Sequence, residues 1–259
     1  MPLRLSKGLR NFLNEGGSLK QAFAGGKIEL YTGTQPASAD DAVSGTLLCV
    51  YTDNSGAHTA EVQATGSVEL TGGGAGSVDT VTVNSIEIMG SSTAFNSSLA
   101  QTAADVANKI NNNPKNMLYM ASVPSGSIIQ IKARPGLGTL PNTWVVASTV
   151  TTITKTDTNM SGGVNSANGL KFGDSANGAL VKDAAQTWSG VGLAPGGTAG
   201  YFRFKGAVSD AGSADSAELY FRLDGSVSTS GANLNLSSTS IVTSATQSIS
   251  AWTLTEPAS

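Results

Sequence analysis

The residues that could do chemistry in this 259-residue chain are few and scattered. His58 is its single histidine. A Ser-His-Asp triad would depend on that residue alone, and no nucleophile-elbow motif accompanies it. Zinc motifs built on paired histidines are excluded for the same reason. We therefore assign no catalytic, cofactor-binding or metal-binding residue, and we expect the chain not to be an enzyme.

Four further features match known sites only in part. The acidic pair Asp40-Asp41 has no companion cluster of carboxylates, which favours solvated loop charges. The stretch 53–56 begins like a calcium loop but lacks the spaced acidic ligands and the distal Glu, so it indicates a turn. The glycine-rich run 71–76 lacks the Gly-Lys-Ser/Thr ending of a phosphate loop. Cys49 stands alone among apolar neighbours, which excludes an internal disulfide and predicts a small buried side chain.

Aromatic rings offer the remaining chemistry, because an exposed ring can stack on a sugar or a base. At strand-like spacing such rings are more typical of a core or an interface. A carbohydrate-binding module stays open as an alternative that requires exposed rings. The rings concerned are Trp188, Tyr201, Phe202, Phe204, Tyr220, Phe221 and Trp252.

Composition and charge limit the partners. Charged residues make up 13% of the chain and the formal net charge is -3, which is too small to indicate any partner. No basic stripe is present, so we expect no nucleic-acid partner. No apolar run approaches the ~20 residues that cross a bilayer, and the first residues do not form a signal peptide. We expect a soluble product of the cytoplasm that does not bind membranes.

The elements that would position any site divide into two parts. Residues 66–163 have the pattern of a complete small α+β domain, one helix on an antiparallel sheet, inserted into another domain. Residues 80–88 alternate at period two, as a half-buried strand or a tight strand pair does. Further period-two stretches occur at 118–123, 127–133, 143–148 and 151–154.

The helix of the insert is predicted with both ends. Ser98 and Gln101 fit a capping box, in which each side chain bonds the other residue's backbone N–H. Pro114 ends the helix, because it has no N–H and disfavours helical geometry before it. One helix face is formed by Leu99, Ala103, Val106, Ala107 and Ile110.

Residues 1–65 and 164–259 are expected to fold together as an antiparallel β-sandwich or barrel-like domain. Short strands at roughly 8–12-residue spacing indicate that class, and neither part alone has enough of them. The segment 6–24 predicts short helical turns, which either dock on a neighbouring subunit or cover their own sheet. Strands are expected at 27–32, 46–52, 179–182, 186–188, 199–206, 217–223, 233–236 and 248–254.

These flanking segments resemble a family of tailed-bacteriophage virion structural proteins, in the order seen here and over most of the outer part. The insert, with Val81-Thr82-Val83-Asn84 and Phe95-Asn96, is similar to a module that occurs within various phage structural proteins. The resemblance rests on the segments 28–40, 45–48, 168–173, 188–190, 198–204, 223–227, 234–239 and 241–242.

The resemblance implies a non-enzymatic structural protein located in the virion, most typically one that decorates or cements the capsid. Its implied partners are the major capsid or head–tail proteins, and it is expected to be a homo-oligomer. A neck, collar, tail or baseplate component is the nearest alternative, and a carbohydrate-binding surface module is the next. A depolymerase-type enzyme would need a cleft of carboxylates that the sequence does not assemble. The family implies no catalytic residues.

Overall fold

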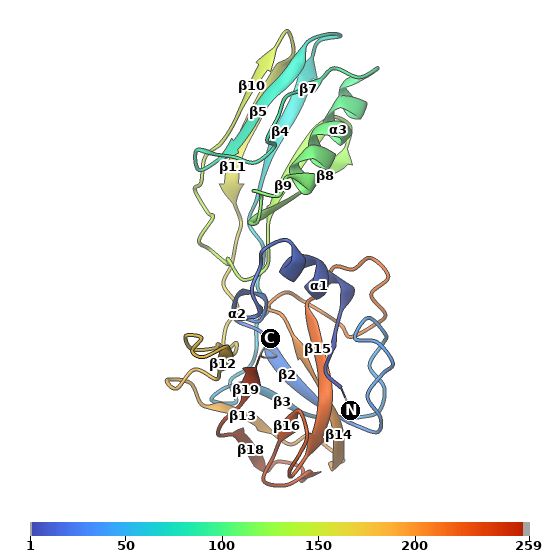
Figure 1. Cartoon of the computed structure of the whole chain (residues 1–259), viewed down its shortest axis with the longest axis vertical. Helices are drawn as coiled ribbons and strands as arrows, with labels where there is room; N and C mark the ends of the chain where they lie inside the picture. Colours follow the sequence, from blue (N-terminus) through green and yellow to red (C-terminus); the bar gives the residue numbers. More distant parts are fainter. Residues whose placement is uncertain (1, 256–259) are drawn as a thin grey trace. The chain divides into compact units, whose positions relative to one another are not determined.

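The computed structural model describes residues 2–255 of the chain. The fold is mainly β with few helices, and apart from one parallel pair of strands its named sheets are antiparallel, as the sequence predicts (Figure 1). The chain forms two units, residues 1–61 with 166–259 (the outer unit) and residues 62–165 (the inserted unit), each with its own hydrophobic core. The sequence places these boundaries at 66 and 163.

Most strands of the outer unit belong to one sheet. Its strand order is β1-β15-β14-β2-β3-β13-β18, with β16 beside β15 and β17 beside β14, while β12 and β19 form a separate pair. The elements are β1 (Arg4–Leu5), α1 (Lys7–Asn14), α2 (Leu19–Ala22), β2 (Lys27–Thr32), β3 (Leu47–Asp53), β12 (Ala179–Val181), β13 (Trp188–Val191), β14 (Gly197–Lys205), β15 (Arg222–Ser228), β16 (Leu234–Asn235), β17 (Ser240–Ile241), β18 (Thr246–Ile249) and β19 (Thr253–Thr255).

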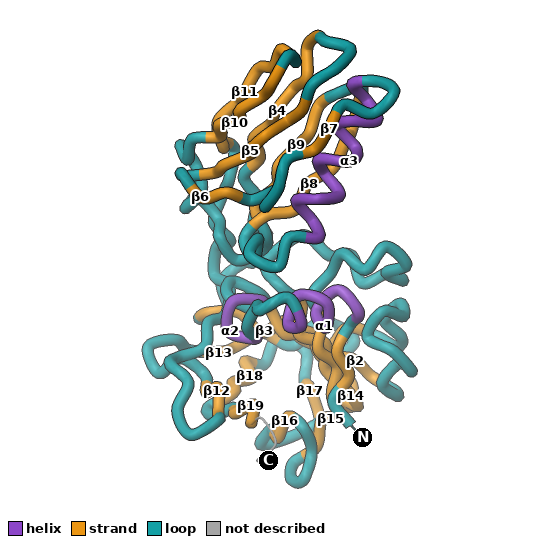
Figure 2. Tube along the Cα trace, turned by 45° about the horizontal axis from the view of Figure 1, so that its top comes forward, coloured by secondary structure: helices purple, strands orange, loops and turns teal. Residues whose placement is uncertain are grey.

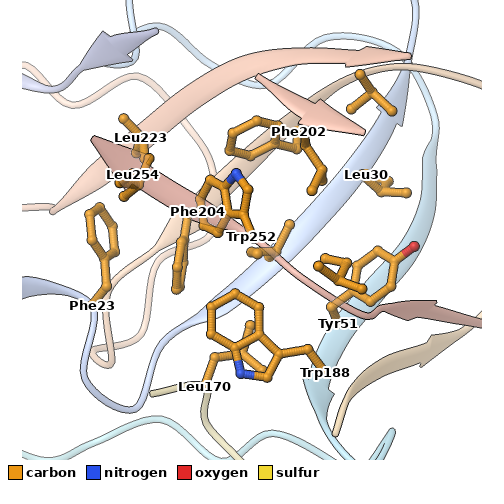
Figure 3. Packing of buried hydrophobic residues seen from close by; sticks show 14 of the residues in the cluster. Phe23, Leu30, Tyr51, Leu170, Trp188, Phe202, Phe204, Leu223, Trp252 and Leu254 are labelled. Carbon is orange, nitrogen blue, oxygen red and sulfur yellow. The ribbon is translucent and has the colours of Figure 1, made fainter. Parts of the chain in front are cut away.

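Aromatic rings fill the core of the outer unit. Phe202 and Phe204, two positions apart on β14, both point into the core (Figure 3). The centroid of the Trp252 ring lies 5.4 Å from that of Phe202 and 5.8 Å from that of Phe204. The Trp188 ring lies 6.0 Å from that of Trp252. Gly225 of β15 leaves room for this packing, since a Cβ there would lie 2.6 Å from the Phe202 ring. Both tryptophans are therefore core residues.

The N-terminal segment covers the core of its own chain. The Ser6 hydroxyl accepts a hydrogen bond from the Leu9 N–H at 3.3 Å and begins α1. Leu9 and Phe12 are buried, and the Phe12 ring stacks on Phe221 at 4.7 Å. Of the two roles left open for residues 6–24, the structure shows the covering one, and β1 pairs with β15 within the same chain.

The inserted unit contains two four-stranded sheets and one helix. Figure 2 colours its strands orange and its helix purple. One sheet has the order β11-β4-β9-β8, and in the other β10, β6 and β7 all pair with β5. The elements are β4 (Thr65–Gly72), β5 (Ser77–Val83), β6 (Ile86–Glu87), β7 (Thr93–Ala94), α3 (Leu99–Asn112), β8 (Tyr119–Ser125), β9 (Ile128–Ala133), β10 (Val146–Thr151) and β11 (Thr154–Ser161).

Helix α3 packs on β8, β9 and β4, and its predicted apolar face is buried except for the partly buried Leu99. The Ser98 hydroxyl accepts from the Gln101 N–H at 3.1 Å, as expected. The reciprocal half of the capping box is wrong: the Gln101 side chain donates to Asp105 at 3.0 Å, and the Ser98 N–H donates to Asn96 O.

Several strand bounds also differ from expectation. The stretch 80–88 is a tight strand pair, with Asn84 and Ser85 at positive φ in the turn between β5 and β6. The strands expected at 143–148 and 151–154 form as β10 and β11, each shifted toward the C-terminus, and β4 was not expected. The stretch 248–254 is divided between β18 and β19, and 217–221 is a loop that precedes β15.

Candidate functional site

His58 is half-buried and has a backbone partner. Its Nε2 lies 3.0 Å from the carbonyl oxygen of Gly25, and burial lowers its pKa. A histidine that acts as a general base needs a hydroxyl or thiol within hydrogen-bond reach and an orienting carboxylate. The observed contact is that of a structural histidine.

The acidic residues of the loops bond the backbone around them. Asp40 accepts from the Lys7 N–H at 3.0 Å at the first turn of α1, and Asp41 accepts from the Ser38 N–H at 2.8 Å. Asp53 accepts from the Thr187 N–H at 3.1 Å, and the turn that follows has positive φ at two residues. Within residues 2–255 no group of three or more His, Cys, Asp or Glu is placed to hold a metal ion.

The remaining candidates from the sequence are Cys49, the glycine-rich run 71–76 and the aromatic rings, and packing accounts for the position of each. Cys49 is buried, which raises the pKa of its thiol to about 12, so it carries no thiolate at neutral pH. The run 71–76 joins β4 to β5, and a Cβ at Gly76 would lie 1.9 Å from Thr151 O. Of the seven aromatic rings, only Tyr220 is not buried, and it is half-buried.

A layer of charged side chains covers the face of the outer sheet opposite its aromatic core. Strand β14 alternates, so that Phe202 and Phe204 face the core while Arg203 and Lys205 lie on the opposite face. Register places Glu29 of β2 and Asp224 of β15 on either side of Arg203. The ionic layer consists of Glu29, Arg203, Lys205, Asp210, Arg222 and Asp224.

The ionic layer is built from close pairs. Arg203 donates to both carboxylate oxygens of Asp224 at 2.7 Å, and both side chains are fully buried. Arg222 donates to both oxygens of Asp210 at 2.7 and 2.6 Å. Lys205 Nζ lies 2.7 Å from Glu29. Two-pronged Arg–carboxylate pairs fix geometry as well as charge.

The same cations hold a loop over the sheet. Arg203 Nη1 donates to Asp41 O at 2.9 Å, and Arg222 Nη1 donates to Ala39 O at 3.3 Å. The Tyr201 hydroxyl donates to Ser44 O at 2.6 Å. These bonds hold the segment between β2 and β3 against the charged face.

A second loop, between β14 and β15, closes over the same face. It contributes Asp210, and Lys205 Nζ donates to Asp210 O at 3.2 Å. The two loops also bond each other, from the Val43 N–H to Gly212 O and from the Asp215 N–H to Asp40 O, both at 2.8 Å. The outer unit thus has two long loops fixed on its sheet by buried charges.

Burial and the neighbouring cations oppose each other at the carboxylates. Burial raises the pKa of Glu29, but Lys205 and Lys27 outweigh it and the net pKa is lowered. Burial also raises the pKa of Asp210, but Arg222 and the Gly212 N–H lower it below its usual value. At Asp224 burial prevails, so its pKa is raised although Arg203 opposes the rise.

The chemistry of the ionic layer is structural. Its three cations match its three anions, and none of its side-chain atoms is among the buried atoms of the described chain that lack a hydrogen-bond partner. Buried charges that satisfy one another fix a conformation and leave no free group for a substrate. The arrangement can hold loops in place.

Beyond the two covering loops, the face of the outer sheet opposite the aromatic core continues over β3 and β13. A cavity of 330 Å³ there is lined by Lys27, Val50, Thr52, Ser55, Gly56, Ala57, His58, Val191 and Leu193. Its hydroxyls are already bonded, Ser55 to Ser189 at 2.9 Å and Thr52 to Gly56 O at 2.7 Å. A second cavity of 330 Å³ lies beside α2 and β12, and four of its ten lining residues are leucines. Neither has the converging polar groups of a substrate site.

Sequence reasoning missed the ionic layer. The signal was present, because Arg203 and Lys205 alternate with phenylalanines, and Arg222 and Asp224 flank Leu223. Alternation places such charges on the face away from the core, and that face is usually solvated. Only the two covering loops, which close over it from distant parts of the chain, make it buried.

Comparison with protein-family models, with curated proteins and with solved structures finds no match to this chain. No helix in the described part of the chain is long and apolar enough to cross a membrane.

Proposed function

We propose that this chain is a non-enzymatic structural protein of a tailed-phage virion, most typically one that decorates or cements the capsid as a homo-oligomer. The segments that resemble virion structural proteins provide the class. The ionic layer is the observation that carries the structural role, because it fixes two loops of the outer unit without offering a free reactive group. A protein held by repeated contacts on a particle needs surfaces of one defined shape.

The inserted unit fits this proposal as a self-contained addition. Thr59 pairs with Ala167 in the outer unit, and Val62 pairs with Val164 in the inserted unit. In each unit the two chain segments at the boundary are therefore neighbours, as insertion into a surface loop requires. The particle contacts then belong to the outer unit.

A neck, collar, tail or baseplate component remains the nearest alternative, and copy number separates the two positions. The carbohydrate-binding alternative is less favoured because its rings are internal. Trp188 is 0% exposed and Trp252 is 6% exposed, so neither offers a stacking platform. A depolymerase would need converging carboxylates, whereas those of the ionic layer are all paired with cations.

The test is the copy number of this chain in purified virions of the phage that encodes it, measured by quantitative mass spectrometry against the major capsid protein. We expect a number comparable with that of the capsid protein. A few copies per particle would favour the neck or tail. Complete absence from particles that are otherwise intact would refute the proposal.

A further inference from the structure

Two strand edges of the inserted unit, those of β8 and β10, are closed by side chains. On β8, Asn111 bonds both the N–H and the C=O of Ala121 at 2.8 Å, and Asn116 bonds both groups of Tyr119 at 3.2 Å. On β10, Asn159 accepts from the Val146 N–H at 3.1 Å and Asp157 accepts from the Ser148 N–H at 2.9 Å. Such groups occupy the positions that a further strand would need.

Strand β18 lies at one end of the outer sheet and differs from these edges. In the described chain its strand partner is β13 alone (Figure 1). The Gly192 N–H donates to Ala245 O at 2.9 Å, and this bond determines which residues of β18 form backbone hydrogen bonds with β13. By alternation Gln247 and Ile249 direct their backbone groups to β13, while Thr246 and Ser248 direct theirs outward.

The open edge of β18 carries no feature that discourages pairing. Residues 243–251 contain no charged residue and no proline. Thr246 and Ser248 are exposed and are regular in register with β13. Edge strands that do not pair are normally protected by charge, proline or a bulge.

Exposed apolar side chains border this edge. Val191 is directly opposite Thr246 and is 43% exposed, and Val242 in the turn before β18 is 59% exposed. A specific interface buries roughly 1,200–2,000 Å² in total, more than a four-residue ladder supplies. These valines, with Leu193 beside them, extend the area that a partner would cover.

We propose that the edge of β18 binds the β18 edge of a second copy of this chain, antiparallel and about a two-fold axis. The proposal deepens the homo-oligomer part of the proposed function. When Thr246 lies opposite Ser248 of the second copy, the outward backbone groups of both residues form hydrogen bonds, about four in total. That register also places each Gln247 opposite its counterpart.

Self-complementarity is the reason for choosing a second copy as the occupant. Hydroxyl pairs across antiparallel strands are favourable, and the register sets a threonine against a serine on both sides of the axis. The uncharged segment 243–251 brings no like charges together in the pair. An isologous contact of this kind forms a closed dimer, or one of the contacts of a larger dihedral assembly.

Sedimentation of the full-length chain tests the surface. We expect wild type to sediment as a dimer or a multiple of it, and Thr246→Lys and Ser248→Pro to raise the dissociation constant at least about tenfold. Thermal unfolding measured at a concentration where wild type is monomeric should be unchanged, which separates weaker association from a damaged fold. Proline is compatible with the fold because the Ser248 N–H faces outward. Thr158→Lys, at an exposed strand position of the inserted unit, is the matched control and should not change the mass.

A disulfide trap tests the register. Gln247→Cys should form an intermolecular disulfide on mild oxidation, because the two residues face each other in a non-hydrogen-bonded pair with Cα atoms about 4.5 Å apart. Ser250→Cys is the control, since its counterpart would be roughly 20 Å away. The buried Cys49 should not interfere.

Each outcome decides one point. A wild-type chain that stays monomeric, or edge variants that associate as wild type does, would overturn the proposal, and cross-linking through Ser250 instead of Gln247 would overturn the register. A chain that dimerises through Gln247 but is absent from virions refutes the proposed function and leaves this surface standing. A chain that is monomeric in solution but present in virions refutes the β18 interface and leaves the proposed function standing.

Discussion

The side-chain amide of Asn111 pairs with the backbone of Ala121 as a neighbouring strand would. Asn111 Nδ2 donates to Ala121 O and the Ala121 N–H donates to Asn111 Oδ1, both at 2.8 Å. Asn111 lies in the last turn of α3, so the helix supplies from its side what a fifth strand would supply from its backbone. The pair couples helix packing to protection of the sheet edge.

Replacing Asn111 by leucine should destabilise the chain by about 1–3 kcal/mol, because the Ala121 N–H and C=O lose their partners. Urea unfolding followed by circular dichroism measures this. Asn112→Leu is the matched control, since the Asn112 side chain bonds only within its own helix, to Asn108 O, at an exposed site. Equal loss of stability in both variants would contradict the assigned role of Asn111.

Breaking the Arg203–Asp224 pair should cost more. Arg203→Met leaves a buried carboxylate without its cation, and we expect a loss of about 3–5 kcal/mol. Adding Asp224→Leu to the same chain removes the unpaired charge and should recover a large part of that loss. Denaturant unfolding of the single and double variants checks this. A double variant less stable than the single one would show that the pair is not the source of the effect.

The alternation of the sequence was sufficient to predict the core but not the second face of the outer sheet. Period two places Phe202 and Phe204 on one side and Arg203 on the other, whatever covers them. Arg203 is bonded by the loop that contains Asp41, and its neighbour Arg222 is bonded by Asp210 of a loop far away in sequence. Local pattern holds no information on such loop closure. Alternation could therefore predict on which face these charges lie, but not that they are buried.

Of the strand expected at 217–223, only residues 222 and 223 form, as the start of β15, for a related reason. Asp215 accepts from the N–H groups of Leu219 and Tyr220 at 3.1 and 2.9 Å, and Glu218 has a φ of 57°. These local bonds compete with a sheet ladder and keep the segment as a loop. The α3 helix was predictable because its apolar spacing, its Ser98 cap and Pro114 are all local signals.

Acid should weaken the fold through Asp210. Its pKa is lower in the folded chain than the value of about 3.9 expected when unfolded. The carboxylate therefore stabilises the fold above that unfolded value, and this stabilisation is lost as the pH falls toward the folded pKa. Asp224, whose pKa is raised, acts in the opposite direction. Urea unfolding at several pH values should show a shallower acid dependence in Asp210→Asn than in wild type, and an identical dependence would contradict the assignment.

Each unit should fold without the other. Joining Glu61 to Ser166 through Asn-Gly leaves a five-residue loop between Thr59 and Ala167, which keeps this pair because its two segments are already antiparallel neighbours. We expect this deletion variant and the isolated fragment 62–165 each to unfold in one cooperative transition, because each unit has a separate hydrophobic core. Calorimetry and amide exchange measure this. A deletion variant that is collapsed but not cooperative would show that the outer unit depends on the insert. A folded variant that is still incorporated into virions would assign the particle contacts to the outer unit.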